Sequence, residues 1–337
     1  MIRHFNIPIF MPEMACPFRC AYCDQHRISG QNQIPDAEQV NKLIQRNLGT
    51  FPKGPKQVEI AFFGGNFTGL PYEMQRNFLA IAQNYLRSGE VQGIRLSTRP
   101  DYIDAERLQL LKDYGVSTIE LGAQSLDAGV LQACGRGHGP EAVEQASEMI
   151  LASGFRLGLQ MMIGLPGDTI QKSVETAERI IALNAHETRI YPCLIVKSTE
   201  LEQMYLQGKY LPVSLDVAVE WSLKLWLLFR QAGVNVIRIG LHPSEGLHGD
   251  ALVAGPYHPS FKELVMTALW RNMFEKYPAW PQGDSVLIEV PANELGVAIG
   301  HKAANRIWLS ERYPKVVFTG REGLAEHAFI IKRLDEC

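Results

Sequence analysis

Cysteine is scarce in this 337-residue chain, and its six copies, at positions 16, 20, 23, 134, 193 and 337, are unevenly placed. The disulfide framework of a secreted protein would spread cysteines along the chain, so this distribution argues against one. Three cysteines packed between positions 16 and 23 indicate metal binding or redox chemistry instead. Cys134, Cys193 and Cys337 are expected to be isolated, buried or incidental thiols.

Long apolar runs are absent too, because no stretch approaches the roughly 20 residues that span a bilayer. The first residues, MIRHFNIPIF, lack the layout of a signal peptide. The net charge is only −3, so no global positive field announces nucleic-acid binding, although a local basic patch is compatible with it. We therefore expect a soluble, cytoplasmic protein without a membrane partner, with one large domain and one small one.

Apolar, β-rich runs alternate with amphipathic helical patterns through most of the chain. The predicted strands are 6–15, 58–65, 93–98, 118–125, 156–166 and 188–196, and the predicted helices 37–48, 72–86, 105–114, 140–153, 170–183 and 215–231. Continuous apolar strands separated by such helices indicate a parallel sheet covered by helices.

Polar and glycine-rich residues follow these strands, as in FFGG, STRP, GAQS and GLPG. In β/α barrels the ligand loops lie at the carboxyl ends of all strands, whereas a doubly wound sheet uses only its switch point. About six strands precede a change of pattern, fewer than the eight of a closed barrel. We therefore predict an α/β fold, a partial (β/α)6 TIM-type barrel.

The pattern changes near Gly240. A loop rich in glycine and proline leads to a helix at 260–277, and a compact strand–helix–strand segment follows from 284. This predicts a barrel over 1–240, a loop and helix extension over 241–280, and a small α/β domain over 281–337. The loop histidines 242, 248 and 258, with Glu245 and Asp250, lack the spacing of a tight metal motif, and we expect a loop network there.

The CxxxCxxC spacing of Cys16, Cys20 and Cys23 leaves three possibilities. A structural zinc site needs a fourth ligand, for which His26 is the nearest candidate. A redox dithiol would use Cys20 and Cys23 and leave Cys16 unexplained. A [4Fe–4S] cluster held by three thiolates would leave one iron open for a substrate or cofactor. Taken alone, the triplet does not decide between zinc and cluster.

Together with Tyr22 before the last cysteine, this motif resembles the signature of the radical S-adenosylmethionine (SAM) superfamily. FFGGNFTGLP, one β/α unit later, is similar to the glycine-rich segment that holds the SAM amino group in that family. The resemblance implies a [4Fe–4S] cluster whose open iron is chelated by SAM. It also implies reductive cleavage of SAM to a 5′-deoxyadenosyl radical, with a reductant such as ferredoxin or flavodoxin.

The segments STRPDYID, LGAQSLD, GRGH, MMIGLPGDT and RIYPCLIVKSTEL resemble the catalytic subunit of the elongator complex. Several of them are shared with oxygen-independent coproporphyrinogen oxidases, and the resemblance covers roughly residues 5–275. The chain ends too early for the acetyltransferase domain of the elongator subunit, so acetyl transfer is not expected. The tyrosine motif of the porphyrin enzymes is also absent, so a porphyrin substrate is not expected.

Carried over by position, the resemblance assigns the cluster to Cys16, Cys20 and Cys23. It assigns cofactor contacts to Gly64, Gly65, Asn66, Thr98, Arg99, Gln124, Ser125, Arg136, Gln160, Met161, Leu165 and Pro166. Within this set Arg136 would pair with the SAM carboxylate, and Met161 could equally be core. Tyr191 and Lys197 are placed on the substrate side.

The segment VPANELGVAIGHKAANRIWLSERYP resembles the core of a KH nucleic-acid-binding module. In that fold a GXXG loop packs against four nucleotides. The loop here is Gly300-His301-Lys302-Ala303, which loses the second glycine but keeps two polar residues, with Arg306 close by. An ordinary α/β appendage with a solvated charged face is the alternative.

The sequence therefore predicts a radical SAM enzyme acting on an unidentified substrate, with a transfer RNA base as the first candidate. A small metabolite, lipid or peptide is the alternative within the enzyme class. A zinc-stabilised RNA-binding protein without catalysis is the alternative outside it. No feature of the sequence specifies an oligomeric state.

Overall fold

The computed structural model describes residues 3–11, 16, 19–24, 34–241, 251–282 and 285–334. The chain separates into two compact units. The first comprises Met1–Ser214 and Leu225–Tyr257, and the second Leu215–Lys224 and His258–Cys337. Among the described helices, none has both the length and the apolar character needed to cross a membrane.

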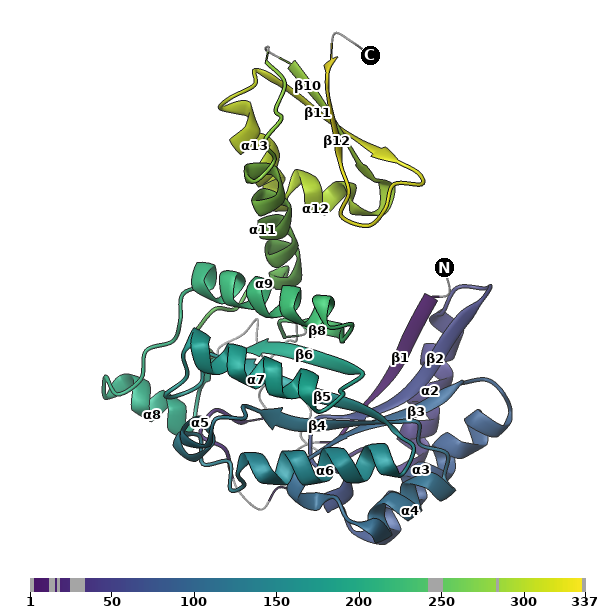
Figure 1. Ribbon diagram of the computed structural model, residues 1–337. Helices are drawn as coiled ribbons and strands as arrows, with labels where there is room; N and C mark the ends of the chain where they lie inside the picture. The colour runs from purple at the N-terminus through teal and green to yellow at the C-terminus, as the bar shows by residue number, and fades with distance from the viewer. Residues whose placement is uncertain are drawn as a thin grey trace. The chain divides into compact units, whose positions relative to one another are not determined.

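The first unit is built on a seven-stranded parallel sheet (Figure 1). Its strands, in spatial order, are β1 (Arg3–Phe10), β2 (Lys56–Phe63), β3 (Gly93–Thr98), β4 (Thr118–Gln124), β5 (Arg156–Ile163), β6 (Glu187–Pro192) and β8 (Asn235–Ile239). A separate antiparallel pair joins β7 (Ile195–Val196) to β9 (Leu252–Ala254).

Strand order distinguishes a barrel-type sheet from a doubly wound one. A doubly wound sheet reverses its order at a switch point, whereas each strand of this sheet lies beside its predecessor. The predicted partial barrel is therefore confirmed. The sequence predicts six strands and the sheet has seven, because β8 is a five-residue, largely half-buried strand without a continuous apolar run.

Helices connect the strands, and α3, α4, α6 and α7 cover one face of the sheet (Figure 1). The helices of this unit are α2 (Ala37–Thr50), α3 (Tyr72–Arg87), α4 (Ala105–Asp113), α5 (Ala128–Ala133), α6 (Pro140–Ala152), α7 (Ile170–Ala182), α8 (Glu200–Leu206) and, shared with the second unit, α9 (Leu215–Gln231). Two 3₁₀ turns, η1 (Phe67–Gly69) and η2 (Pro100–Tyr102), follow β2 and β3. The local sequence determines where α2 begins, because Asp36 and Gln39 form a reciprocal capping box at its N-terminus.

The two faces of the sheet differ in chemistry because side chains alternate along a strand. Ile94, Ile119 and Leu157 are fully buried on the face that packs against the helices. The alternate positions hold Arg95 and Glu120, which are also buried and form an ion pair. We call this second face the inner face of the sheet.

The second unit has a three-stranded sheet in the order β11-β10-β12. Strand β10 (Ser285–Pro291) pairs in parallel with β11 (Lys315–Arg321) and antiparallel with β12 (Ile330–Arg333). Its helices are α11 (Phe261–Glu275), α12 (Leu295–Ile299) and α13 (Ala304–Ser310), and the turns η3 (Ala292–Glu294) and η4 (His301–Ala303) flank α12. Trp270 and Phe274 of α11 lie in its core, so this helix belongs to the second unit. The division of the chain at 240 and 280 stays a prediction.

Candidate cluster and cofactor site

The segment after β1 contains the three clustered cysteines. Cys20 is 6% exposed, and Cys16 and Cys23 are half-buried. The backbone N–H of Ala21 donates to the Cys134 carbonyl over 2.9 Å, which ties this segment to the end of α5. None of the five cysteines in the described part of the chain forms a disulfide. The three sulfur atoms are therefore thiols, the form from which metal-binding thiolates arise.

A buried apolar cluster supports this segment. Cys20 and Tyr22 belong to it, together with Val130, Cys134, Leu165, Cys193, Ile195, Leu201 and Tyr210. Burial raises the pKa of Cys193 to about 12 and raises that of Cys134 further, so both stay protonated. The expectation of buried thiols holds for these two residues, whereas Cys337 and the alternative zinc ligand His26 lie outside the described residues.

A buried arginine reaches the same segment from the turn after α5. The Nη1 atom of Arg136 donates to the Sγ atom of Cys20 over 3.4 Å, and its Nη2 atom donates to the Gly122 carbonyl over 2.5 Å. Burial by itself would lower the pKa of this guanidinium. The nearby Tyr22 hydroxyl and Cys20 thiol outweigh burial and raise that pKa above its ordinary value, so the group stays charged.

Four buried polar atoms near Arg136 have no hydrogen-bond partner among the described residues. They are Tyr22 Oη, Gln124 Oε1, Arg136 Nε and His138 Nε2. A buried polar atom left unsatisfied costs about 1–3 kcal/mol, so several around one arginine indicate the position of a polar ligand.

His138 is neutral in this environment. Burial and the Arg136 charge lower the pKa of His138 to about 4. Its Nδ1 atom lies 3.1 Å from the Gly139 carbonyl, which can only accept, so Nδ1 holds the hydrogen. The Nε2 atom is therefore an acceptor, available to a ligand that donates.

Gly64 and Gly65 follow β2 at its carboxyl end, and both are half-buried. Gly64 has φ +104°, and a Cβ there would lie 2.8 Å from Cδ1 of Phe10 and 3.0 Å from the Met11 carbonyl oxygen. The backbone angle and the closeness of the end of β1 therefore both demand glycine. Close packing against β1 is one reason for this glycine, independent of any ligand.

Asn66 links the ends of β2 and β3. Its side chain is buried, and Oδ1 accepts from the Thr98 hydroxyl over 2.6 Å and from the Arg99 N–H over 3.2 Å. The Arg99 guanidinium contacts both carboxylate oxygens of Asp101 and donates to the Arg136 carbonyl over 2.9 Å. These contacts place Asn66, Thr98 and Arg99 at one edge of the sheet beside the arginine that reaches Cys20.

Gln124 and Ser125 end β4 in different directions. Gln124 adopts φ +66° at a register shift in the β4–β5 pairing, and its Nε2 atom lies close to Gly122. The Ser125 hydroxyl accepts from the Asp127 N–H over 3.1 Å and lies 3.5 Å from the Thr176 hydroxyl of α7. Gln124 thus lies beside Gly122, whose carbonyl accepts from Arg136, while Ser125 contacts helix α7.

Strand β5 presents its predicted residues on opposite faces. The Gln160 amide lies on the inner face, where it donates to the Ser97 hydroxyl and to Glu120. Met161 is fully buried on the other face, and Met162 packs instead against the cluster of Cys20 and Tyr22. Leu165 belongs to that cluster, and Pro166 after it is buried.

A charged network that the motifs did not identify crosses the inner face. Arg95 bonds to Glu59, Glu120 and Glu187, and Arg189 takes both carboxylate oxygens of Glu120. Burial alone would raise the pKa of Glu120, but Arg189 and Arg95 hold it below its usual range. The signal in the sequence was a charged residue at alternate positions of strands that are otherwise apolar.

The two residues assigned to the substrate side lie in different surroundings. The Tyr191 hydroxyl accepts from Nη1 of Arg189 over 3.3 Å, which extends the inner-face network toward the carboxyl end of β6. Lys197 is exposed after β7. Of the two, Tyr191 therefore lies on the inner face with the network.

In the second unit the turn from Gly300 to Ala303 is sharply bent. Gly300 has φ +91°, and a Cβ there would lie 2.9 Å from the Asn305 backbone nitrogen. Lys302 and Ala303 adopt φ +52° and +60°, so the lost glycine of the GXXG pattern is replaced by an alanine in a left-handed conformation. Lys302 and Arg306 are exposed, whereas His301 is half-buried with Nδ1 3.3 Å from Glu263.

Asn305 is the residue of this turn that sequence reasoning missed. It is fully buried, and its amide donates to the carbonyls of Thr267 and Ala298. Its Oδ1 accepts from Arg271 over 3.0 Å. A single asparagine on a short helix forms no sequence motif. Only the structure shows that Asn305 links the turn to α11 and α12 through its hydrogen bonds.

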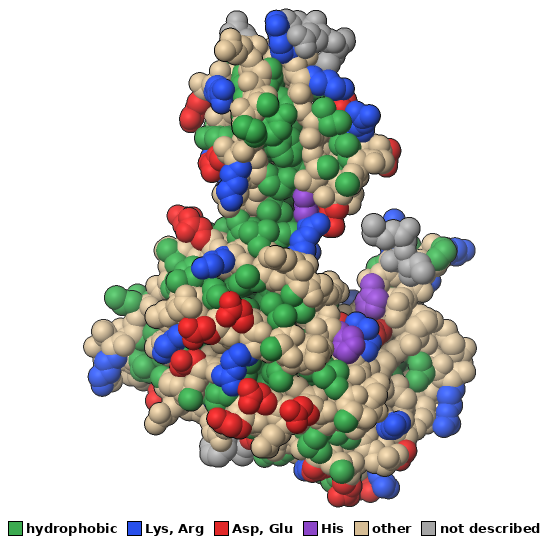
Figure 2. All heavy atoms as spheres, viewed as in Figure 1, with side chains coloured by type: hydrophobic (Ala, Val, Ile, Leu, Met, Phe, Trp, Pro, Cys, Tyr) green, Lys and Arg blue, Asp and Glu red, His purple; other side chains and the backbone are tan. Residues whose placement is uncertain are grey.

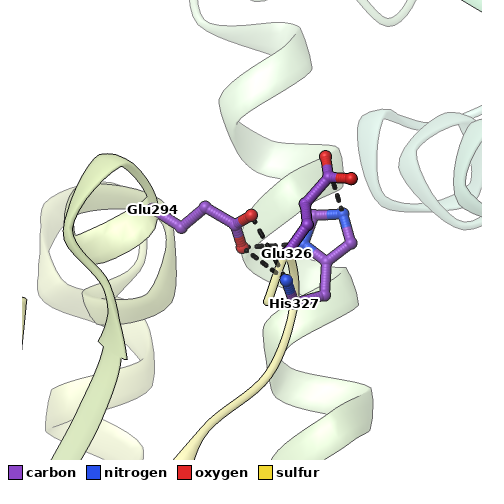
Figure 3. Close-up of side chains that lie close together, drawn as sticks. All are labelled: Glu294, Glu326 and His327. Carbon is purple, nitrogen blue, oxygen red and sulfur yellow. Dashed lines mark hydrogen bonds and ion pairs between the residues drawn. The ribbon is translucent and has the colours of Figure 1, made fainter. Parts of the chain in front are cut away.

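In the described part of the chain, one group of residues that includes a histidine has ligand atoms close enough to hold a metal ion. Residues 242–250, which include four of the five members of the predicted loop network, lie outside the described residues, and His258 packs edge-on against His301. Glu294, Glu326 and His327 gather at one point of the second unit (Figure 3). The ring of His327 places Nδ1 2.7 Å from Glu294 and Nε2 3.7 Å from Glu326. One ligand atom from each residue lies within 4.8 Å of the others, and the contacts present, with Nδ1 of His327 bonded to Glu294, stabilise a turn.

Comparison with models of protein families shows which family this chain belongs to. The model described as Radical SAM superfamily matches residues 14–180, and the model described as Radical_SAM C-terminal domain matches residues 185–271. The two ranges together take in more than half of the chain. The chain belongs to the radical SAM superfamily. Superfamily members use a [4Fe–4S] cluster and SAM, so the cofactors predicted from the motifs are confirmed at the level of the family.

The chain is similar to an uncharacterised protein of Methanocaldococcus jannaschii, with 32% identity over 60% of each chain. It is 26% identical to the tRNA uridine(34) acetyltransferase of Methanocaldococcus infernus, over 49% of this chain and 34% of that protein. It is 28% identical to the heme chaperone HemW of Bacillus subtilis, over 58% and 52%. The chain therefore spans less than two thirds of the length of each of these three relatives. The acetyltransferase and HemW agree with the two subgroups that the motifs indicate.

A solved structure of the archaeal Methanocaldococcus infernus Elp3, with residues 1–46 deleted, matches the fold with a TM-score of 0.61. The match covers 81% of this chain and 64% of that one at 19% identity. At this identity the likeness supports the radical SAM fold alone.

The described residues fit the cofactors of the radical SAM superfamily. Cys16, Cys20 and Cys23 supply three thiols, which would hold the cluster. The unsatisfied atoms of Tyr22 and Gln124, with those of Arg136 and His138, supply donors and acceptors for a polar ligand such as SAM beside it. Which of these atoms contacts SAM stays a prediction.

Proposed function

We propose that this chain binds a [4Fe–4S] cluster through Cys16, Cys20 and Cys23 and uses it to cleave SAM reductively. One electron from an external reductant, of the ferredoxin or flavodoxin class, breaks the C5′–S bond and yields methionine and a 5′-deoxyadenosyl radical. That radical takes a hydrogen atom from a substrate and becomes 5′-deoxyadenosine. The superfamily supplies this chemistry, and the residues of this chain bind, orient and shield the reactants.

One observation supports the proposal most strongly. The sulfur of Cys20, in the segment after β1, accepts a hydrogen bond from a buried arginine, and buried polar atoms beside that arginine have no partner among the described residues. A closed zinc site would need a fourth protein ligand. It would also leave these buried polar atoms without a hydrogen-bond partner. The apolar cluster around Cys20 limits water access, which a radical reaction requires.

The first experiment separates the cluster from zinc. Protein made under anaerobic, iron-replete conditions is analysed for iron, sulfide and zinc. We expect about four irons and four sulfides per chain, and loss of most of the iron in Cys20→Ala. One zinc and no iron, in wild-type protein that binds RNA, would replace the enzyme by a zinc-stabilised RNA-binding protein.

For the substrate we propose RNA, with a transfer RNA base as the target. The elongator-type relatives support this, since one of them is named as a tRNA uridine(34) acetyltransferase. Lys302 and Arg306 are exposed on the turn that resembles a GXXG loop, and Figure 2 shows several basic side chains on the second unit. On the first unit, acidic and basic side chains are intermixed on the face in view.

The second experiment measures transfer RNA binding against salt concentration. Lys302→Glu and Arg306→Glu should weaken binding and flatten its salt dependence, because each removes a positive charge near the phosphates. Lys209→Glu, an exposed lysine of the first unit with the same change of charge, is the matched control. Binding that survives both variants at all salt concentrations removes RNA from the proposal and leaves a small metabolite, lipid or peptide.

A further inference from the structure

Arg136 contacts the sulfur of Cys20, whereas the resemblance assigns this arginine to the SAM carboxylate. Of the three nitrogens of its guanidinium, Nη1 donates to the Cys20 sulfur and Nη2 to the Gly122 carbonyl. Each of these two nitrogens therefore directs one of its two hydrogens to a protein acceptor, and the bond of Nη1 fixes the guanidinium at the sulfur. The remaining atom, Nε, is buried without a partner among the described residues.

The surroundings hold this arginine in one position. The side chain is 7% exposed, the backbone N–H of Arg136 donates to the Leu131 carbonyl, and its own carbonyl accepts from Arg99. Gly135 and Gly137 flank it with φ +60° and +79°, a turn that other residues rarely adopt. The guanidinium is thus placed at the sulfur by the fold.

Gly122 on β4 makes room for it. A Cβ at this position would lie 2.9 Å from Nη2 of Arg136. Because Gly122 has no side chain, the Arg136 guanidinium can lie between the Gly122 carbonyl and the Cys20 sulfur. Its backbone angle lies outside the left-handed region, so an alanine there would displace Arg136, and the Gln124 amide that would lie equally close, without straining the backbone.

We propose that Arg136 is a positioning residue for the cluster, which holds the Cys20 thiolate by an N–H···S bond and raises the reduction potential of the cluster. Reduction adds one negative charge to the cluster. A buried cation bonded to a ligand sulfur stabilises the more negative, reduced state more than the oxidised one. The inference rests on the proposed cluster, and it concerns electron acceptance rather than the SAM carboxylate.

The test is a redox titration of cluster-loaded protein without SAM, followed by electron paramagnetic resonance of the reduced cluster. Arg136→Met should lower the midpoint potential enough to reduce the amount of reduced cluster about tenfold at a given potential, which is about 59 mV for a one-electron couple. Arg136→Lys, which keeps the charge, should lie between Arg136→Met and wild type. Arg46→Met, an exposed arginine on α2, should not change the potential.

SAM binding is measured on the same proteins by equilibrium dialysis of the oxidised form. An unchanged dissociation constant with a lowered potential supports the inference. An unchanged potential with a dissociation constant raised tenfold or more overturns it and returns Arg136 to the carboxylate. If Arg136→Met takes up no cluster, Gly122→Ala decides by the same two measurements. Wild-type protein without iron would defeat the proposed function instead.

Discussion

At the scale of single residues, Gly64 shows how a glycine can be required by packing. The motif assigns it to the cofactor because glycines approach ligands closely, yet its missing Cβ faces Phe10 and the Met11 carbonyl. Packing against β1 and close approach to a ligand both need glycine, so the observed packing leaves the cofactor role of Gly64 a prediction. The collision depends on where β1 ends relative to β2, which no local pattern encodes.

Gly64→Ala should therefore destabilise the protein by roughly 2–5 kcal/mol, from the strained backbone and the overlap with Phe10 together. Urea unfolding of cofactor-free protein measures it. Gly89→Ala is the matched control, because Gly89 has φ +78° and a Cβ added there would have no neighbouring atom within 4 Å. It should cost about 1 kcal/mol. Equal losses in the two variants would show that the contact with β1 has no weight.

His138 gives a prediction of pH dependence. The unfolded chain binds a proton on this residue below about pH 6.5, whereas the folded chain does so only near pH 4. Between these values the unfolded state holds more protons, so folding stability falls as pH falls through this window. In urea unfolding from pH 7 to 5, His138→Gln should lose less stability than wild type. Parallel losses in the two proteins would mean that His138 titrates normally.

At the scale of elements, the sheet is held by charges on its inner face as well as by apolar packing against its helices. The alternation of strands and helices could be predicted because it repeats from the first strand to about residue 240. The network of Arg95, Glu120 and Arg189 could not be predicted, because these partners on β3, β4 and β6 are far apart in the sequence. Likewise the direction of Ser125 toward α7 and of Met161 away from the inner face follows from register, not residue type.

Glu120→Gln tests the network. It would leave Arg95 and Arg189 with less compensation in a buried setting, and we expect a loss of about 3–5 kcal/mol in the free energy of unfolding. Glu38→Gln removes an exposed pair with Lys42 on α2 and should cost no more than about 0.5 kcal/mol. If the two variants unfold at the same urea concentration, the inner-face charges do not hold the sheet.

At the scale of the whole molecule, the chain combines a radical SAM half-barrel with a small α/β unit. The family, the fold and the three cysteines followed from spaced motifs, since those depend on few residues in fixed order. The placing of α11 in the second unit and the hydrogen bonds of Asn305 depend on contacts between distant segments, so the sequence did not reveal them. The substrate is the part that motifs address least, because it depends on loops and on the second unit.

The most direct test of the central claim is the release of 5′-deoxyadenosine. Reconstituted protein is incubated anaerobically with SAM and dithionite, and the product is quantified by liquid chromatography. We predict formation of 5′-deoxyadenosine with methionine in equal amounts by wild-type protein, and none by Cys20→Ala or without dithionite. Wild-type protein that contains four irons per chain yet forms no 5′-deoxyadenosine under these conditions would contradict the account.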